Sequence, residues 1–182
     1  MALVGMGKIY LPWGRKMALA AVAASFCFSG PNPVASRYLP LFVIERSVNA
    51  NVVHYDAKLG PDGKLDPREP VVAYWIMRAE DGRRQDLNLI ERLKAYGFTT
   101  QASGADAYKL SIVSEKMRQI LVTHEANAAR AEMLIGGCHA YLQRIFVNTR
   151  KSMLLNFAES AELQGVDTTS GQPCREIIAA GR

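Results

Sequence analysis

The predicted fold rests on the stretch Val71-Val72-Ala73-Tyr74-Trp75-Ile76-Met77, which follows Pro70. β-Branched and aromatic residues of this kind favour extended backbone. Because both faces of the stretch are apolar, we expect a central strand that is covered on both sides. The sequences Gly60-Pro61-Asp62-Gly63 before it and Asp81-Gly82 after it are typical of tight turns. This segment therefore predicts the middle of a β-sheet.

Further segments with strand character extend in both directions from this stretch. They are Leu41–Ile44, Asn51–Asp56, Tyr108–Val113, Gln119–Glu125, Ala129–Ile135, His139–Asn148, Phe157–Val166 and Pro173–Ile178. Gly136-Gly137 is a typical two-residue hairpin turn between two of them. Short strands at this spacing predict a mainly β (α+β) fold, an antiparallel β-barrel or sandwich of about eight strands.

One helix is predicted, over Asp86–Tyr96. Its first residue can cap the helix, and Leu89, Ile90 and Leu93 share one face at helical spacing. A helix of this length is stable only when its apolar face is buried by tertiary contacts. We therefore expect these three side chains to pack against the sheet.

The N-terminal region, residues 1–36, has the form of a signal peptide. Basic residues precede the apolar run Met17–Phe28, Gly30–Pro33 interrupts any helix, and Val34–Ser36 offers small residues for cleavage. The apolar run is shorter than the roughly 20 residues that cross a bilayer. We expect a protein that is exported to the periplasm or secreted, with no transmembrane span after cleavage.

Cleavage would leave residues 37–182 as a single β-rich domain. The hydrophobic content of 49% excludes a disordered chain. The leader holds three of the 22 Lys and Arg residues and none of the 17 Asp and Glu residues, so the net charge falls from +5 to +2. No basic stripe with interleaved aromatic residues remains, and nucleic acid is therefore not an expected partner.

Cys138 and Cys174 remain after cleavage, in a compartment where disulfides form. Following the hairpins places both at the same end of the sheet, which favours pairing. A simple meander, however, puts the strand Phe157–Val166 between them, at roughly twice the 4.8 Å strand spacing. Disulfides rarely tolerate Cα separations beyond about 7 Å. A Cys138–Cys174 disulfide stays open, and it requires a different strand order or a bent final segment.

Several short motifs resemble a known bacterial family. They are Leu41–Ser47, Asn49–Asn51, Tyr55–Ala57, Pro70–Ile76, Ala95–Gly97 and Leu142–Ile145. The family is catalogued as a domain of unknown function, numbered 4833, and the resemblance covers nearly all of the chain after the leader. It implies an exported single domain of about this size, and it implies no activity, ligand or catalytic residue.

His54 and Asp56 are the best candidates for catalysis. Residues two apart on a strand share a face, so the carboxylate could orient the imidazole, and Glu45 on the preceding strand could approach them. Such a pair can act as a general base, which would make the protein a small envelope hydrolase or isomerase. The other interpretation is an edge-strand salt bridge or a solvated face.

No metal or cofactor is predicted. The histidines His54, His124 and His139 lack the close spacing of metal ligands, and Cys138 and His139 are neighbours that point to opposite faces of a strand. The sequence also contains no Gly-rich phosphate loop before a helix and no G-x-S-x-G motif.

Tyr74, Trp75 and Tyr96 are the candidate ligand-binding residues, because aromatic walls with few polar groups suit small-molecule sites. Ordinary core packing is the alternative role for them. With no recognisable catalytic set, we predict a non-catalytic binding module for a small apolar ligand, a glycan or a partner protein of the envelope.

Overall fold

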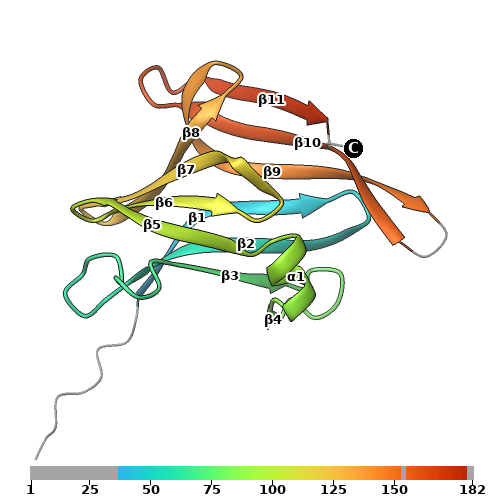
Figure 1. Ribbon diagram of the computed structural model, residues 1–182, viewed down its shortest axis with the longest axis horizontal. Helices are drawn as coiled ribbons and strands as arrows, with labels where there is room; N and C mark the ends of the chain where they lie inside the picture. The colour runs from blue at the N-terminus through green and yellow to red at the C-terminus, as the bar shows by residue number, and fades with distance from the viewer. Residues whose placement is uncertain (1–36, 153–154, 180–182) are drawn as a thin grey trace, which may run out of the picture. The chain divides into compact units, whose positions relative to one another are not determined.

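The computed structural model describes residues 37–152 and 155–179, in which eleven strands form one sheet (Figure 1). The strands are β1 (Arg37–Arg46), β2 (Asn49–Leu59), β3 (Val71–Ile76), β4 (Arg84–Asp86), β5 (Phe98–Gly104), β6 (Ala107–Ile112), β7 (Glu115–Glu125), β8 (Ala128–Ile135), β9 (Cys138–Ser152), β10 (Leu155–Asp167) and β11 (Pro173–Ala179). A short helix, α1 (Leu89–Lys94), lies between β4 and β5. The signal-peptide prediction falls on residues 1–36, outside the described part of the chain.

The mainly β fold is confirmed, with more strands than the sequence pattern reveals. The two additional strands are β4 and β5, which occupy the two ends of the strand order β4-β3-β2-β1-β9-β8-β7-β6-β5. Every residue of β4 is exposed, and most of β5 is exposed as well. Edge strands of this kind carry no alternation of apolar and polar residues, which is the signal by which strands are recognised in a sequence.

The long strand β9 is the branch point of the sheet. Along one edge it pairs with β10. Along its other edge, residues 138–141 pair with β8 and residues 144–147 pair with β1, the one parallel pair among the described strands. The sheet therefore divides into an N-terminal leaf (β1–β4) and a middle leaf (β5–β8), with β9–β11 as a C-terminal ribbon. Figure 1 shows the middle leaf curling in front of the N-terminal leaf.

The core lies between the two leaves, and Tyr55 of β2 is at its centre. This side chain is fully buried and stacks on Phe42 of β1, with ring centroids 4.4 Å apart. It also contacts Phe98 of the middle leaf at 5.8 Å. Val53, Leu110 and the other buried aliphatic side chains surround this cluster. Tyr55 therefore connects the cores of the two leaves.

The apolar stretch around Trp75 forms β3, which pairs with β2 on one side and with β4 on the other. Trp75 points into the core and is 4% exposed, while Tyr74 points to the outer face and is 9% exposed. The predicted central position is wrong, because only the short exposed strand β4 separates β3 from the end of the strand order. Burial is uneven as well, since Val72 and Ile76 on the outer face are half-buried.

The predicted packing of the helix is wrong. Helix α1 is six residues long and begins after Asn88, which forms a capping box with Glu91. Leu89, Ile90 and Leu93 are 70%, 74% and 62% exposed. The middle leaf, and not the helix, covers the inner face of the N-terminal leaf, and the three helix side chains face solvent.

This exposure predicts that Leu93→Ala changes the free energy of unfolding by at most about 0.5 kcal/mol, as expected for a surface substitution. Leu87 precedes the helix, is 5% exposed and serves as the matched control. We expect Leu87→Ala to be destabilising by about 2–5 kcal/mol, because it leaves a void in the core. Urea unfolding followed by circular dichroism measures both. Equal losses in the two variants would show that the helix is packed after all.

A bend in β10 brings the C-terminal ribbon back over the middle leaf. The pairing of β10 with β9 shifts between Gln164 and Gly165. A Cβ at Gly165 would lie 2.5 Å from the carbonyl oxygen of Tyr141, so only glycine fits this close approach. Beyond the bend, β11 passes the turn between β8 and β9, where the Gly136 amide donates a 2.9 Å hydrogen bond to Glu176.

Candidate functional site

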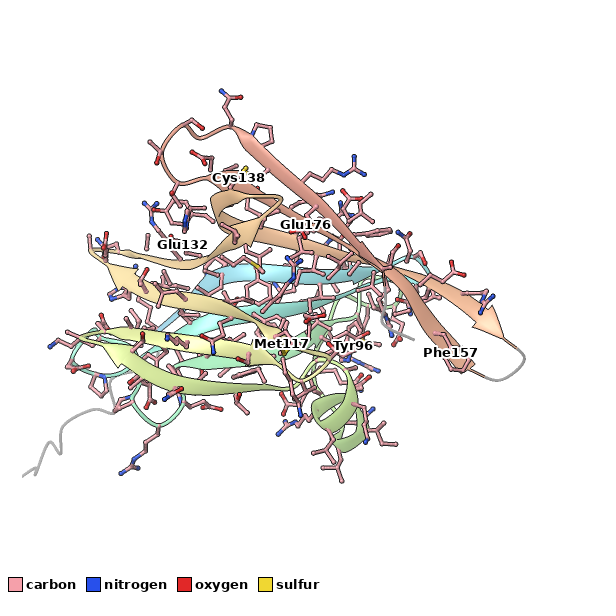
Figure 2. The ribbon with its side chains drawn as sticks, turned by 45° about the horizontal axis from the view of Figure 1, so that its top comes forward. Tyr96, Met117, Glu132, Cys138, Phe157 and Glu176 are labelled. Carbon is pink, nitrogen blue, oxygen red and sulfur yellow. The ribbon has the colours of Figure 1, made fainter. Side chains whose placement is uncertain are left out.

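A cavity of about 450 Å³ lies between the leaves and the C-terminal ribbon, at the end of the sheet next to α1. Its walls come from β1, β6, β7, β8, β9, β10 and β11. Most of the side chains that line them are apolar: Ile44, Val48, Ala95, Ile112, Ile120, Met133, Ile145, Val147, Ala158, Ala161, Leu163, Ile178 and Ala179. Figure 2 shows Tyr96 beside α1 and Glu176 on β11, across the strands from it.

Burial falls from the floor of the cavity to its mouth. Ile44, Ile120 and Leu163 on the walls are 2–4% exposed. Val48, in the turn between β1 and β2, is 39% exposed, and Lys94 at the end of α1 is exposed as well. The cavity therefore has a buried, mainly apolar floor and a more exposed mouth beside Val48 and Lys94.

Arg46, the last residue of β1, carries a positive charge at this mouth. Its guanidinium lies 4.4 Å from the ring centroid of Trp75 and 5.9 Å from that of Tyr96. One terminal nitrogen donates a 3.3 Å hydrogen bond to the Asn49 side chain. The Nε atom is buried and has no hydrogen-bond partner among the described atoms. Two aromatic rings therefore contact the Arg46 guanidinium, and its Nε–H has no acceptor among the described atoms.

Arg118 of β7 is a second half-buried cation of the cavity wall, and it is neutralised. Its guanidinium donates two hydrogen bonds, of 2.8 and 2.6 Å, to the carboxylate of Glu176 on β11. These bonds, together with the Gly136 amide, lower the pKa of Glu176 to about 2. A bidentate pair of this kind links β7 to β11. Its role is to close the wall of the cavity.

The three predicted ligand-binding residues are divided between two faces of the sheet. Tyr74 points to the outer face, where its hydroxyl donates a 2.5 Å hydrogen bond to Asp56. Trp75 and Tyr96 meet edge to face inside, with ring centroids 5.1 Å apart. Tyr96 alone of the three lines the cavity. Burial raises its pKa, and the nearby Arg46 guanidinium opposes that shift, so the phenol is neutral at physiological pH.

The predicted catalytic residues lie on the outer face, away from the cavity. His54 and Asp56 share that face as expected, and His54 stacks on Tyr74 at 5.7 Å. Asp56 accepts its hydrogen bond from Tyr74, while Glu45 is paired with Arg144 at 2.5 Å. Burial lowers the pKa of His54, a shift that Asp56 opposes, so the ring is neutral at pH 7. None of the three candidates lines the cavity.

Sequence reasoning missed Arg46, although a signal for it exists. Phe42 and Ile44 alternate along β1 and are 3% and 4% exposed. Arg46 is the next residue in that phase, so a strand reading predicts a cation on the inner face. A charged side chain in phase with core residues at a strand end is therefore a useful indicator of a site mouth.

Two thiols lie close together at the other end of the sheet, away from Phe157 (Figure 2). The sulfurs of Cys138 and Cys174 and a carboxylate oxygen of Asp167 lie within 4.8 Å of one another. The hydrogen bond to Cys138, followed by desolvation, raises the pKa of the Cys174 thiol to about 11. Thiolates and carboxylates are zinc ligands, so these groups could hold a metal ion. Both cysteines are free, and their disulfide stays a prediction.

The fold and the cavity define a small β-rich protein with an apolar interior site and a cationic mouth. Within the described residues, no helix has the length and apolarity needed to cross a bilayer. The sequence model of the family described as Domain of unknown function (DUF4833) matches residues 42–176, and the chain belongs to that family. No curated protein and no solved structure matches the chain.

Proposed function

We propose that this chain is an exported, non-catalytic binding module that holds a small, mainly apolar ligand. The observation that carries the proposal is the cavity of about 450 Å³ with aliphatic walls. This volume falls within the range of about 300–1,000 Å³ that is usual for small-molecule sites, and such sites are lined mainly by apolar side chains.

The side chains that line the cavity favour one of three partner classes: a small apolar ligand, a glycan or a protein. A glycan needs many hydrogen-bonding groups, whereas most of the lining is apolar and its small polar side chains are Ser114, Thr149 and Ser160. A protein partner would contact an exposed surface, whereas the deep walls are buried. The hydrolase alternative requires a substrate cavity at His54, and the residue faces away from this one. A small apolar ligand is therefore the class that the geometry favours.

Filling the cavity tests the proposal. Ala161 of β10 lines the wall and pairs with Val147 and Ile178, which line it as well. We expect Ala161→Trp to place an indole in the space that the ligand occupies. The affinity for the neutral dye Nile red should fall by at least about tenfold. The affinity for hexadecanol, measured by displacement of the dye, should fall by the same factor. Fluorescence titration measures both.

Ala128→Trp is the matched control, because Ala128 is exposed on β8 and does not line the cavity. It should bind the dye as the unmodified protein does, and circular dichroism should show that both variants are folded. Normal binding by folded Ala161→Trp, or no binding by the unmodified protein, would contradict the proposal.

A further inference from the structure

We infer that the ligand of this cavity is a single-chain amphiphile whose anionic head binds to Arg46. This inference rests on the proposed function and adds the chemical class of the ligand. The head group is a carboxylate or a phosphate, since both present the oxygens that a guanidinium recognises. The chain is aliphatic, as the walls are.

The first support is the unsatisfied hydrogen-bonding capacity of Arg46. Its buried Nε has no partner among the described atoms. No carboxylate oxygen described in the structure lies within 4.0 Å of its nitrogens, in contrast to Arg118 and Arg144, which are paired with Glu176 and Glu45. Buried donors in native proteins are normally satisfied. A bound anion would supply the missing acceptor.

The second support is the position of the guanidinium. The rings of Trp75 and Tyr96 hold it at the mouth, and cation–π contacts of this kind restrict its movement. Ile44, two residues earlier on the same strand, belongs to the deep wall. A molecule that places its head on Arg46 can therefore extend its chain into the aliphatic interior.

The third support is the charge balance of the lining. It contains the cations Arg46, Lys94 and Arg118 and one carboxylate, Glu115. Glu176 neutralises Arg118, and Lys94 is exposed to solvent. Arg46 is therefore the partly buried cation of the described lining that has no carboxylate partner. Its charge counts for more than that of Lys94, because desolvation strengthens ionic hydrogen bonds.

Three probes share one alkyl chain and differ in the head group: hexadecanoate, hexadecyl phosphate and hexadecanol. Comparing their affinities separates the contribution of the head group from that of the chain. Each affinity is measured by displacement of Nile red, below the critical micelle concentration of the probe. We expect the unmodified protein to bind at least one of the two anions about 10–100-fold more tightly than the alcohol, the gain expected for hydrogen bonds to a charged group. The anion that binds more tightly identifies the head group.

Arg46→Gln should remove the preference for the anion and leave the affinity for hexadecanol nearly unchanged. The retained hexadecanol affinity also shows that the variant is folded. Arg46→Lys should keep part of the preference, since the charge remains and the planar fork is lost. Lys109→Gln is the matched control, because Lys109 is an exposed cation of β6 that does not line the cavity, and it should keep the full preference.

The possible failures are distinguishable. Equal affinity of the unmodified protein for anion and alcohol would overturn the role of Arg46 and leave the proposed function standing, and this comparison does not depend on the folding of any variant. A preference that survives Arg46→Gln would also overturn it. Binding of none of the three probes would overturn the proposed function together with this inference.

Discussion

Replacing Tyr55 with alanine should lower the free energy of unfolding by about 3–5 kcal/mol, the usual effect of deleting a buried aromatic ring. The ring is fully buried, stacks on Phe42 at 4.4 Å and contacts Phe98 at 5.8 Å. Because Phe42 belongs to the N-terminal leaf and Phe98 to the middle leaf, the void would separate the two halves of the core. Urea unfolding of the unmodified and variant proteins measures the loss.

Tyr55→Phe separates the hydroxyl from the ring. The hydroxyl donates a 2.5 Å hydrogen bond to the main-chain carbonyl of Tyr96. Leaving that partly buried oxygen unpaired should be destabilising by about 1–3 kcal/mol. Tyr96 lines the cavity, so this variant should also bind Nile red more weakly. If Tyr55→Ala were destabilising by less than about 1 kcal/mol, the two leaves could not be packed through this residue.

Gly165→Ala should be destabilising by about 3 kcal/mol, at the upper end of the usual effect of overpacking. The new Cβ would lie 2.5 Å from the carbonyl oxygen of Tyr141 and 2.9 Å from Cδ1 of Ile135. The first of these atoms is main chain and cannot rotate away. The matched control is Gly104→Ala at the end of β5, where the nearest atom outside the adjacent residues is 3.9 Å away. That substitution should be nearly neutral in the same unfolding assay.

The same variant tests the bend in β10 through the two thiols. In the unmodified protein, oxidised glutathione at alkaline pH should convert the thiols of Cys138 and Cys174 to an internal disulfide while it is itself reduced to two glutathione thiols. Their sulfurs lie within 4.8 Å of each other, and Gly165 is the residue of β10 that pairs with Cys174. We expect the bridge to form much more slowly in Gly165→Ala. Mass mapping that finds two free thiols in the oxidised, unmodified protein would contradict the predicted disulfide.

Local patterns in the sequence were sufficient for all the strands except β4 and β5, and for which residues share a face. The run around Trp75 predicts a strand with both faces covered, and His54 and Asp56 lie on one face because side chains alternate along a strand. The same alternation, extended by one step, places Arg46 in phase with Ile44. The signals for β4 and β5 were absent, since exposed edge strands need no apolar alternation.

The candidate site could be predicted only in part. Tyr74 and Trp75 were predicted as ligand-binding residues because they are aromatic. Neighbours on a strand point to opposite faces, so only one of the two can face the interior. Tyr96 lies in the segment that follows α1, and it lines the cavity. The helical spacing of Leu89 and Leu93 correctly placed them on one face, and nothing in that spacing specifies what covers it.

The sequence by itself determined the mainly β class, the membership of the family and the alternation of side chains along each strand. The tertiary structure alone decided that β9 joins three groups of strands, that Val43 pairs with Arg144 in a parallel register, and that the sulfur of Cys174 lies within 4.8 Å of that of Cys138. The physical reason is the range of the forces involved. Backbone propensity and side-chain alternation act between neighbours, whereas pairing, curling and the cavity depend on contacts between residues far apart in the chain, which only the folded core selects.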